Sequence, residues 1–360
     1  MIAQKLKDNA IPGAVVLIDK GGEGRWLQTF GTANVDADVP VRPDDYFRVG
    51  SNTKTMTATV ILQLVQEGKL KLDDPVSRYY PGVPNGDTIT IAQLLELRSG
   101  LPDYMDDPVF LQQPHRVWRP KELLALSFAK PVNFAPGAQF EYSNTNYILL
   151  GVIIEKVTGM AASAAFQQRI FEPLGLAHTS LPAPGDNTIT DPHAHGYMFQ
   201  TDAANIDHIE LTPEQQAAAL AGTWKPVDVT DWSPSTGWTA GSVISTAEDM
   251  ATYTKALAAG GLLGDKTQQL RVDSIQPIDP SKPDGAGYGL GLARIPPHLF
   301  GHTGKIAGYD AVTGYDPNID LLVVILTNLN DTPALKDPAV QLLSPVVFQF
   351  YGANKSNPSN

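Results

Sequence analysis

One stretch of the chain combines a helical hydrophobic pattern with reactive side chains. Apolar residues recur three and four positions apart, as on one face of a helix, at Met56, Val60, Ile61, Leu64 and Val65. Gly68 follows the last of them and supplies a stop signal. The pattern therefore predicts a helix that begins just after Ser51.

Short apolar runs at both ends of the chain predict strands. Residues 13–19 and 26–31 have the character of two strands joined by a glycine-rich turn. Four further runs follow one another near the carboxyl end, at residues 288–294, 299–305, 309–315 and 321–327. We therefore expect one antiparallel sheet that is built from both chain ends.

Helical patterns fill most of the chain between these strands. They occupy residues 90–97, 121–129, 147–157, 161–171, 214–220 and 247–259, and a closing helix is expected at 334–350. The predicted fold class is mixed α/β, an antiparallel sheet flanked by helices with a mostly helical inserted domain. We place a discontinuous sheet domain at 1–47 and 240–352, the helical domain at 48–239 and a polar tail at 353–360.

A long segment without helical or strand pattern covers residues 103–119. Loops of this length inside a compact domain are usually functional or disordered. Three aromatic residues lie in it, Tyr104, Phe110 and Trp118. These rings favour the interpretation that the loop covers a pocket.

Composition excludes several classes of function. The chain has 360 residues, no cysteine and a formal net charge of -12. The negative charge and the lack of a basic tract disfavour a nucleic-acid partner. The missing cysteines exclude disulfides, thiolate catalysis and cysteine metal sites. No apolar run approaches the roughly 18 residues of a membrane-spanning helix, and nothing in the sequence indicates an oligomeric state.

The first residues lack the apolar core of an export signal, since residues 1–7 include two lysines. We expect an exported protein, periplasmic or extracellular, whose signal is absent from this sequence. A cytoplasmic protein is the alternative, and composition fits both.

Ser51 and Lys54 form the first candidate catalytic group. The two residues are three positions apart on the first turn of the predicted helix, so the Lys54 ammonium can reach the Ser51 hydroxyl. A serine becomes a useful nucleophile when a basic neighbour takes its proton, and a helix N-terminus favours a developing oxyanion. The competing interpretation is a plain helix cap. The short Ser-x-x-Lys pattern also occurs at Ser127 and Lys130, where no partner motif is near.

Tyr142 and Asn144 form the second group, in the only Tyr-x-Asn of the chain. A phenol beside an ammonium loses its proton more easily and can serve as general base and then as acid. The amide of Asn144 can hold a substrate amide or the lysine. The competing interpretation is a tyrosine packed on a helix end with an asparagine cap.

The third group is the sequence His302, Thr303, Gly304 and Lys305 on a predicted strand. Glycine on a strand often marks close approach of another backbone or a ligand. Such an edge can pair with an extended substrate while its N–H groups face an oxyanion. Unperturbed, His302 would change charge near pH 6.5, so its cation could assist an anionic substrate. An ordinary strand end is the competing interpretation.

In this order, the three groups resemble those of the serine β-lactamase and penicillin-binding protein superfamily. The tyrosine-type second motif and the His-Thr-Gly third motif are similar to the branch of class C β-lactamases, D-alanyl-D-alanine carboxypeptidases and related esterases. The likeness is strongest to the exported carboxypeptidases, and extends to residues 63–70, 98–101 and 287–292.

The resemblance implies a role for each residue. Ser51 is acylated with help from Lys54, Tyr142 shuttles the proton, and the backbone N–H groups of Ser51 and Lys305 form the oxyanion hole. Asn144, His302, Thr303, Gly304 and Lys305 bind the substrate. No cofactor is implied, and the expected partner is a small-molecule or peptide acyl substrate.

Two positions depart from the carboxypeptidase pattern. Ala293 stands where an arginine would help hold the substrate's carboxylate, with Arg294 one residue late, and Lys305 replaces a threonine. A one-residue shift on a strand turns a side chain to the opposite face, although Lys305 could replace the missing charge. A carboxylesterase or D-amino-acid amidase or peptidase therefore competes with the carboxypeptidase. A penicillin-binding sensor that acylates without turnover and an inactive peptide-binding homologue also remain.

A metal site has little support. His193 and His195 form a possible ligand pair, but no third ligand has recognisable spacing.

Overall fold

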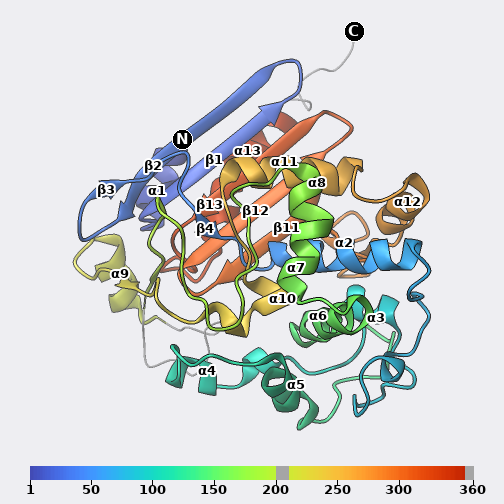
Figure 1. Ribbon diagram of the computed structural model, residues 1–360. Coiled ribbons are helices and arrows are strands. Elements are labelled where there is room, and N and C mark those ends of the chain that lie inside the picture. The colour runs from blue at the N-terminus through green and yellow to red at the C-terminus, as the bar shows by residue number, and fades with distance from the viewer. Residues whose placement is uncertain (200–210, 353–360) are drawn as a thin grey trace.

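The computed structural model describes residues 1–199 and 211–352. Its centre is a nine-stranded antiparallel sheet to which both chain ends contribute (Figure 1). From one edge to the other, the strands are β3 (Val39–Pro40), β2 (Gly24–Asn34), β1 (Gly13–Lys20), β13 (Leu321–Thr327), β12 (Tyr309–Asp316), β11 (Leu299–Ile306), β10 (Ala293–Ile295), β9 (Gly287–Tyr288) and β8 (Gln276–Pro277). The predicted joining of the chain ends is confirmed by the pairing of β1 with β13.

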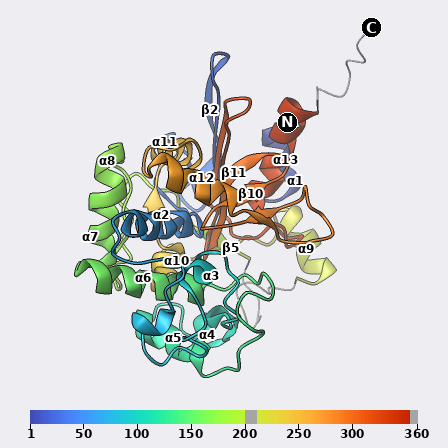
Figure 2. The ribbon, with the colours of Figure 1, turned by 90° about the vertical axis from the view of Figure 1, so that its right-hand side faces the viewer.

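Helices cover both faces of the sheet, which is seen edge-on in Figure 2. Alternate residues of β13 explain why, since Val323 and Ile325 belong to one core and Val324 and Leu326 to the other. The first core includes α1 (Ile2–Asp8) and α13 (Pro338–Tyr351), and the second includes α11 (Ala247–Ala259). The continuous apolar run of β13 is typical of a strand that is buried on both faces.

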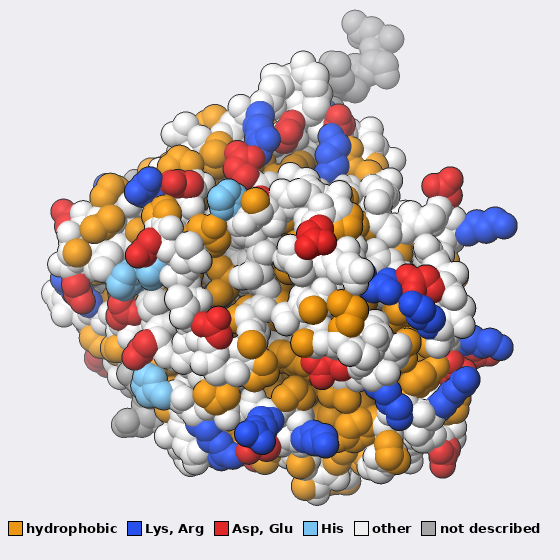
Figure 3. Space-filling view, in the orientation of Figure 1, with side chains coloured by type: hydrophobic (Ala, Val, Ile, Leu, Met, Phe, Trp, Pro, Cys, Tyr) orange, Lys and Arg blue, Asp and Glu red, His pale blue; other side chains and the backbone are white. Residues whose placement is uncertain are grey.

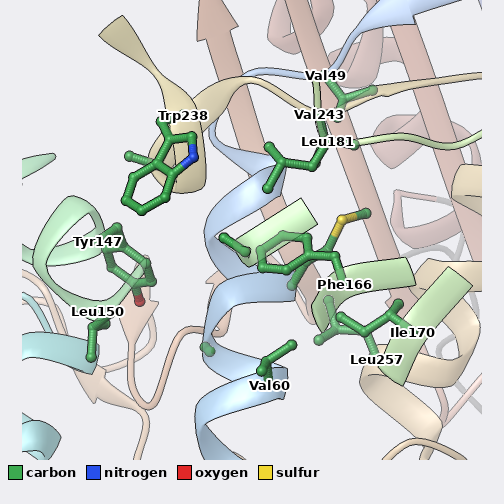
Figure 4. Close-up of a cluster of buried hydrophobic side chains, with 14 of the residues drawn as sticks. Val49, Val60, Tyr147, Leu150, Phe166, Ile170, Leu181, Trp238, Val243 and Leu257 are labelled. Atoms are coloured by element: carbon green, nitrogen blue, oxygen red, sulfur yellow. The ribbon is translucent and has the colours of Figure 1, made fainter. Parts of the chain in front are cut away.

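The helix α2 (Asn52–Gln66) lies at the centre of the helical part. It packs against α6 (Thr145–Thr158), α7 (Ala162–Phe166) and α10 (Trp238–Gly241), as Figure 4 shows for Tyr147, Phe166 and Trp238. The sequence pattern predicted a helix with one apolar face, but α2 is buried nearly all round. Its polar side chains donate to nearby carbonyls. Thr57 Oγ1, for example, donates to the Thr239 carbonyl at 2.6 Å.

The other elements are short. The remaining helices are α3 (Ile91–Leu95), α4 (Val109–Gln112), α5 (Pro120–Phe128), α8 (Glu172–Leu174), α9 (Pro213–Leu220) and α12 (Asp265–Asp273). The 3-10 segments are η1 (Val76–Arg78), η2 (Tyr104–Asp106) and η4 (Pro234–Thr236), and η3 (Gln167–Phe171) is a π-helical turn. Two small ribbons pair β4 (Phe47–Arg48) with β7 (Ile244–Ser245) and β5 (Tyr197–Met198) with β6 (Val227–Asp228).

The prediction of one strand at 288–294 is wrong. The segment folds back on itself, so that β9 and β10 are antiparallel neighbours. Gly291 has a φ of +69°, which an L side chain rarely adopts, and the Gly289 N–H donates to the Leu292 carbonyl. The predicted helix at 161–171 is also divided, into α7 and the π-helical turn. The predicted tail at 353–360 lies outside the described residues.

Charged side chains of both signs are interspersed with apolar ones on the face drawn in Figure 3. Among the described residues, no single helix is long and apolar enough to cross a membrane. One pair, Thr145–Thr158 with Ala162–Leu174, reaches the required length and composition only together, across a bend of 80°.

The start of α2 lies directly against β11. A Cβ placed on Gly304 would lie 2.1 Å from the Val49 carbonyl oxygen and 3.0 Å from the Ser51 nitrogen. A Cβ on Gly50, whose φ is +53°, would lie 2.6 Å from the Lys305 nitrogen. Only glycine permits this approach from either side, and it brings the backbone nitrogens of Ser51 and Lys305 to one place.

We therefore predict that Gly304→Ala forces β11 away from α2. It should lower the free energy of unfolding by about 2 kcal/mol, and it should remove activity that depends on Ser51. Urea unfolding and ester hydrolysis measure the two effects. Gly264→Ala is the control, because its Cβ would meet no atom closer than 3.8 Å. Equal stability of the two variants would contradict the close approach.

Candidate active site

Ser51 stands at the N-cap position of α2 but does not act as a cap. Its φ of -62° and ψ of -5° are already helical, and its side chain makes no capping hydrogen bond. The hydroxyl instead meets two other groups. Lys54 Nζ lies 2.8 Å away and the Tyr142 hydroxyl 2.6 Å away. The geometry favours the nucleophile interpretation over the cap.

Lys54 is fully buried and held by oxygens from three segments. Besides Ser51, its Nζ donates to Asn144 Oδ1 at 2.7 Å and to the Ala240 carbonyl at 2.8 Å. Three acceptors match the three donors of an ammonium. A buried charge is stable only when it is satisfied in this way, so these contacts fix the amine beside the serine.

Tyr142 contacts Ser51 from the loop that precedes α6. Its side chain is 41% exposed, so the phenol faces both solvent and the serine. Lys54 Nζ lies 4.8 Å from the centre of its ring. An alcohol, an amine and a phenol therefore meet at one point, as the first two sequence motifs predicted.

Asn144 is the N-cap residue of α6, and it too makes no side-chain cap. Its oxygen faces Lys54, while its Nδ2 donates to Asp103 Oδ2 at 2.8 Å. The backbone N–H of Asn144 donates to the same carboxylate oxygen at 3.0 Å. Asp103 was not among the residues predicted from the sequence, where its only signal is a carboxylate at the start of the long loop.

His302 lies behind the site, 3% exposed. Its Nδ1 contacts the Thr303 carbonyl, and its Nε2 lies 3.2 Å from the Tyr288 hydroxyl. Burial, and then the charge of Lys54, lower the pKa of His302 to about 4. The expectation of a charge change near pH 6.5 is therefore wrong, because this imidazole is neutral at neutral pH.

Lys305 does not present an uncompensated charge. Its Nζ lies 2.7 Å from Asp331 and 2.8 Å from Asp337. Burial by itself would lower the pKa of Lys305, but attraction to the two carboxylates outweighs it and holds the pKa above its usual value. Arg294, one residue late in the sequence, donates to the carbonyls of Pro283 and Gly285 instead. The suggestion that Lys305 replaces a lost carboxylate-binding charge is therefore not supported by these contacts.

A cavity of about 290 Å³ opens beside Ser51. Tyr142, Asn144, Thr303, Gly304 and Lys305 contribute to its polar side. The apolar part of the lining comes from the 103–119 loop and from residues before α10, namely Tyr104, Met105, Phe110, Leu111, Pro114, Trp232 and Pro234. The loop therefore lines the cavity, and its predicted role as a cover stays a prediction. Trp118 lies outside the lining and packs against Phe110 at a ring distance of 4.9 Å.

Comparison with known proteins decides the family. The family model described as Beta-lactamase matches residues 1–344. The chain belongs to the beta-lactamase family. The mixed α/β fold and the membership of this superfamily, both predicted from the sequence, are thereby confirmed.

Solved structures resemble this beta-lactamase-family protein over nearly its whole length. A D-stereospecific amidohydrolase from Streptomyces sp. superposes with a TM-score of 0.80 at 31% identity, covering 98% of both chains. The D-amino acid amidase from Ochrobactrum anthropi SV3, complexed with L-phenylalanine amide, gives 0.80 at 28% identity, covering 99% of this chain and 98% of the other. The family and these neighbours are hydrolases.

Protein flp from Staphylococcus aureus (strain N315) is 28% identical over 339 residues. The match covers 92% of this chain and 62% of that protein, so the beta-lactamase-family chain spans less than two thirds of its relative's length.

The two histidines that suggested a metal pair are each bound to a carboxylate. His193 Nδ1 lies 2.8 Å from Asp191, and His195 Nδ1 lies 2.6 Å from Asp228. Within residues 1–199 and 211–352, no group of three or more histidines and carboxylates is arranged to hold a metal ion.

The neutral His302 predicts a pH dependence of stability. In the unfolded chain it binds a proton below about pH 6.5, but in the folded protein only below about pH 4. The unfolded state therefore binds more protons between these values, and stability falls as the pH falls through this window. The loss should reach about 3 kcal/mol at pH 4.

Urea unfolding of the wild type and of His302→Asn, at pH 7.5, 5.5 and 4.5, isolates this contribution. The difference in unfolding free energy between the two proteins should change with pH, because other titrating groups are common to both. A difference that is constant from pH 7.5 to 4.5 would mean that His302 titrates equally in both states.

Proposed function

We propose that this protein is a serine hydrolase that forms an acyl-enzyme on Ser51 and cleaves amides or short peptides of D-amino acids. The observation that carries the proposal is the double contact of Ser51 Oγ, at 2.8 Å to the Lys54 amine and 2.6 Å to the Tyr142 phenol. This spacing allows direct proton transfer from the serine.

The reaction we propose uses Tyr142 as the group that moves the proton. Lys54 donates to three oxygens as an ammonium, and its positive charge favours the anionic phenol beside it. Tyr142 takes the proton of Ser51 as Oγ bonds to the carbonyl carbon. The same proton then passes to the leaving amine as the C–N bond breaks.

Water completes the cycle by the reverse route. Tyr142 takes a proton from the attacking water, the bond from the acyl carbon to Ser51 Oγ breaks, and the proton returns to the serine. In both steps the negative carbonyl oxygen is stabilised by the backbone N–H groups of Ser51 and Lys305, which the glycine contact brings together.

The electrostatics at the far side of the site favour an amide over a substrate with a free carboxylate. Lys305 is paired with two carboxylates, Arg294 points elsewhere and His302 is neutral. Among these three groups a D-alanyl-D-alanine peptide would find little positive charge for its terminal carboxylate, although the buried Arg48 also lines the cavity. The similarity over the whole chain to a D-stereospecific amidohydrolase and to a D-amino acid amidase supports the same choice.

The apolar wall supports a bulky side chain on the acyl group. Phe110 and Trp232 line the cavity beside Ser51 and keep some exposed surface, whereas Tyr104 is fully buried behind the lining. Aromatic rings pack favourably against one another. We therefore favour D-phenylalanine amide as the first substrate to test, and a short-chain ester as the second.

Ser51→Ala should lower the hydrolysis of D-phenylalanine amide and of p-nitrophenyl acetate by at least about a thousandfold, because it removes the nucleophile. Ammonia release and absorbance measure the two rates. The matched control is Ser127→Ala, from the second Ser-x-x-Lys pattern, which should keep both activities. Its hydroxyl donates to the Pro102 carbonyl and takes no part in the proposed chemistry.

The same assays should rank the substrates. We expect kcat/KM for D-phenylalanine amide to exceed that for a D-alanyl-D-alanine peptide by about tenfold or more. The opposite ranking would favour a D-alanyl-D-alanine carboxypeptidase over the proposed amidase. A β-lactam adduct that forms but does not decay, without hydrolysis of amide or ester, would instead identify a penicillin-binding sensor.

A further inference from the structure

The carboxylate of Asp103 takes no part in the proposed chemistry. It contacts Asn144, however, and Asn144 contacts Lys54. Its Oδ2 accepts from the backbone N–H of Asn144 at 3.0 Å and from the side-chain Nδ2 at 2.8 Å. Its Oδ1 accepts from the Met105 N–H at 3.0 Å, at the start of η2. One side chain therefore joins the 103–119 loop to the segment that carries Tyr142 and Asn144.

These contacts fix which way the Asn144 amide points. An asparagine amide can be turned over, exchanging its oxygen and nitrogen. A carboxylate only accepts hydrogen bonds and an ammonium only donates them. With Asp103 on one side and Lys54 on the other, the nitrogen must face Asp103 and the oxygen must face Lys54, at 2.7 Å.

The amide orientation matters because Asn144 Oδ1 is one of the acceptors that hold the Lys54 ammonium in place. Ser51 Oγ and the Ala240 carbonyl also accept from it. If the amide turned over, an N–H₂ group would face the ammonium and repel it. The amine would then leave its place beside Ser51 and Tyr142.

We propose that Asp103 is a positioning residue of the acyl-transfer reaction, acting through the orientation of Asn144. This inference rests on the proposed function of Ser51. Asp103 contacts Asn144 and Met105, one step removed from Ser51 Oγ, so its loss should lower kcat and leave the binding of a small substrate nearly unchanged. A displacement of about 1 Å in such a group is enough to lower a rate by up to a hundredfold.

The 103–119 loop extends the same link to the cavity wall. Tyr104 and Met105, which follow Asp103 directly, both line the cavity. The carboxylate therefore links the position of this part of the wall to the position of the Lys54 amine. A small ester such as p-nitrophenyl acetate separates the two effects, because it does not need the wall.

The experiment compares kcat and KM of p-nitrophenyl acetate hydrolysis in Asp103→Ala, Asp103→Asn and Asp106→Asn. Asp103→Ala should lower kcat by about tenfold to a hundredfold with KM within about twofold. Asp103→Asn keeps one acceptor oxygen and should lose less. Asp106→Asn removes the same charge from an exposed position in the same turn and should match the wild type.

A second pair of variants tests the route through Asn144. If Asp103 acts by orienting Asn144, then adding Asp103→Ala to Asn144→Ala should change kcat by less than about twofold. Independent, multiplying losses would overturn the inference. So would a kcat of Asp103→Ala, per folded molecule, equal to that of the wild type.

Folding and function are kept apart by two further measurements. Urea unfolding of the wild type, Asp103→Ala, Asn144→Ala and the double variant should also show losses of stability that are not additive, because the two side chains share a hydrogen bond. Additive losses of stability would overturn the link even if no ester were hydrolysed. Ester hydrolysis that survives Ser51→Ala, in contrast, contradicts the proposed function and not the contact between Asp103 and Asn144.

Discussion

The site depends on keeping one amine buried and satisfied next to a serine. Lys54 has no exposed surface, and it is held by oxygens of Ser51, Asn144 and Ala240. These come from the start of α2, the start of α6 and α10, which pack against one another. The cost of burying a charge is large unless each donor finds an acceptor, so the three elements must keep their relative positions.

Two other basic side chains near this amine carry little free charge. His302 is neutral, because burial lowers its pKa to about 4, and Lys305 is paired with Asp331 and Asp337. This distribution of charge supports the proposed preference for an amide over a peptide with a free carboxylate.

Much of the fold could be predicted because its pattern is local. The β13 strand is a continuous apolar run that turn residues separate from β12, and α2 is marked by apolar residues at helical spacing. The division between β9 and β10 could not be predicted, because glycine occurs in strands and turns alike. Only the backbone angle, as at Gly291, distinguishes the two. The meeting of Ser51, Lys54 and Tyr142 was predictable because side-chain chemistry and chain order both point to it.

Other parts of the site depend on contacts between distant segments. The Ala240 carbonyl is a backbone group and leaves no mark in the sequence. Asp103 meets Asn144 only because its loop folds against the start of α6. The pKa of His302 depends on how completely it is buried, and the pairing of Lys305 joins residues 26 positions apart. Such effects follow from the tertiary structure and cannot be assigned from residue types alone.

The most direct test of the account is to find where an acyl group attaches. Intact-mass spectrometry after rapid mixing with an activated ester, followed by peptide mapping, should show one added acyl group on Ser51. The adduct should decay as product appears, and Lys54→Ala should slow its formation by orders of magnitude. An acyl group on any other residue, or turnover without an adduct on Ser51 under conditions that trap it, would contradict the central claim.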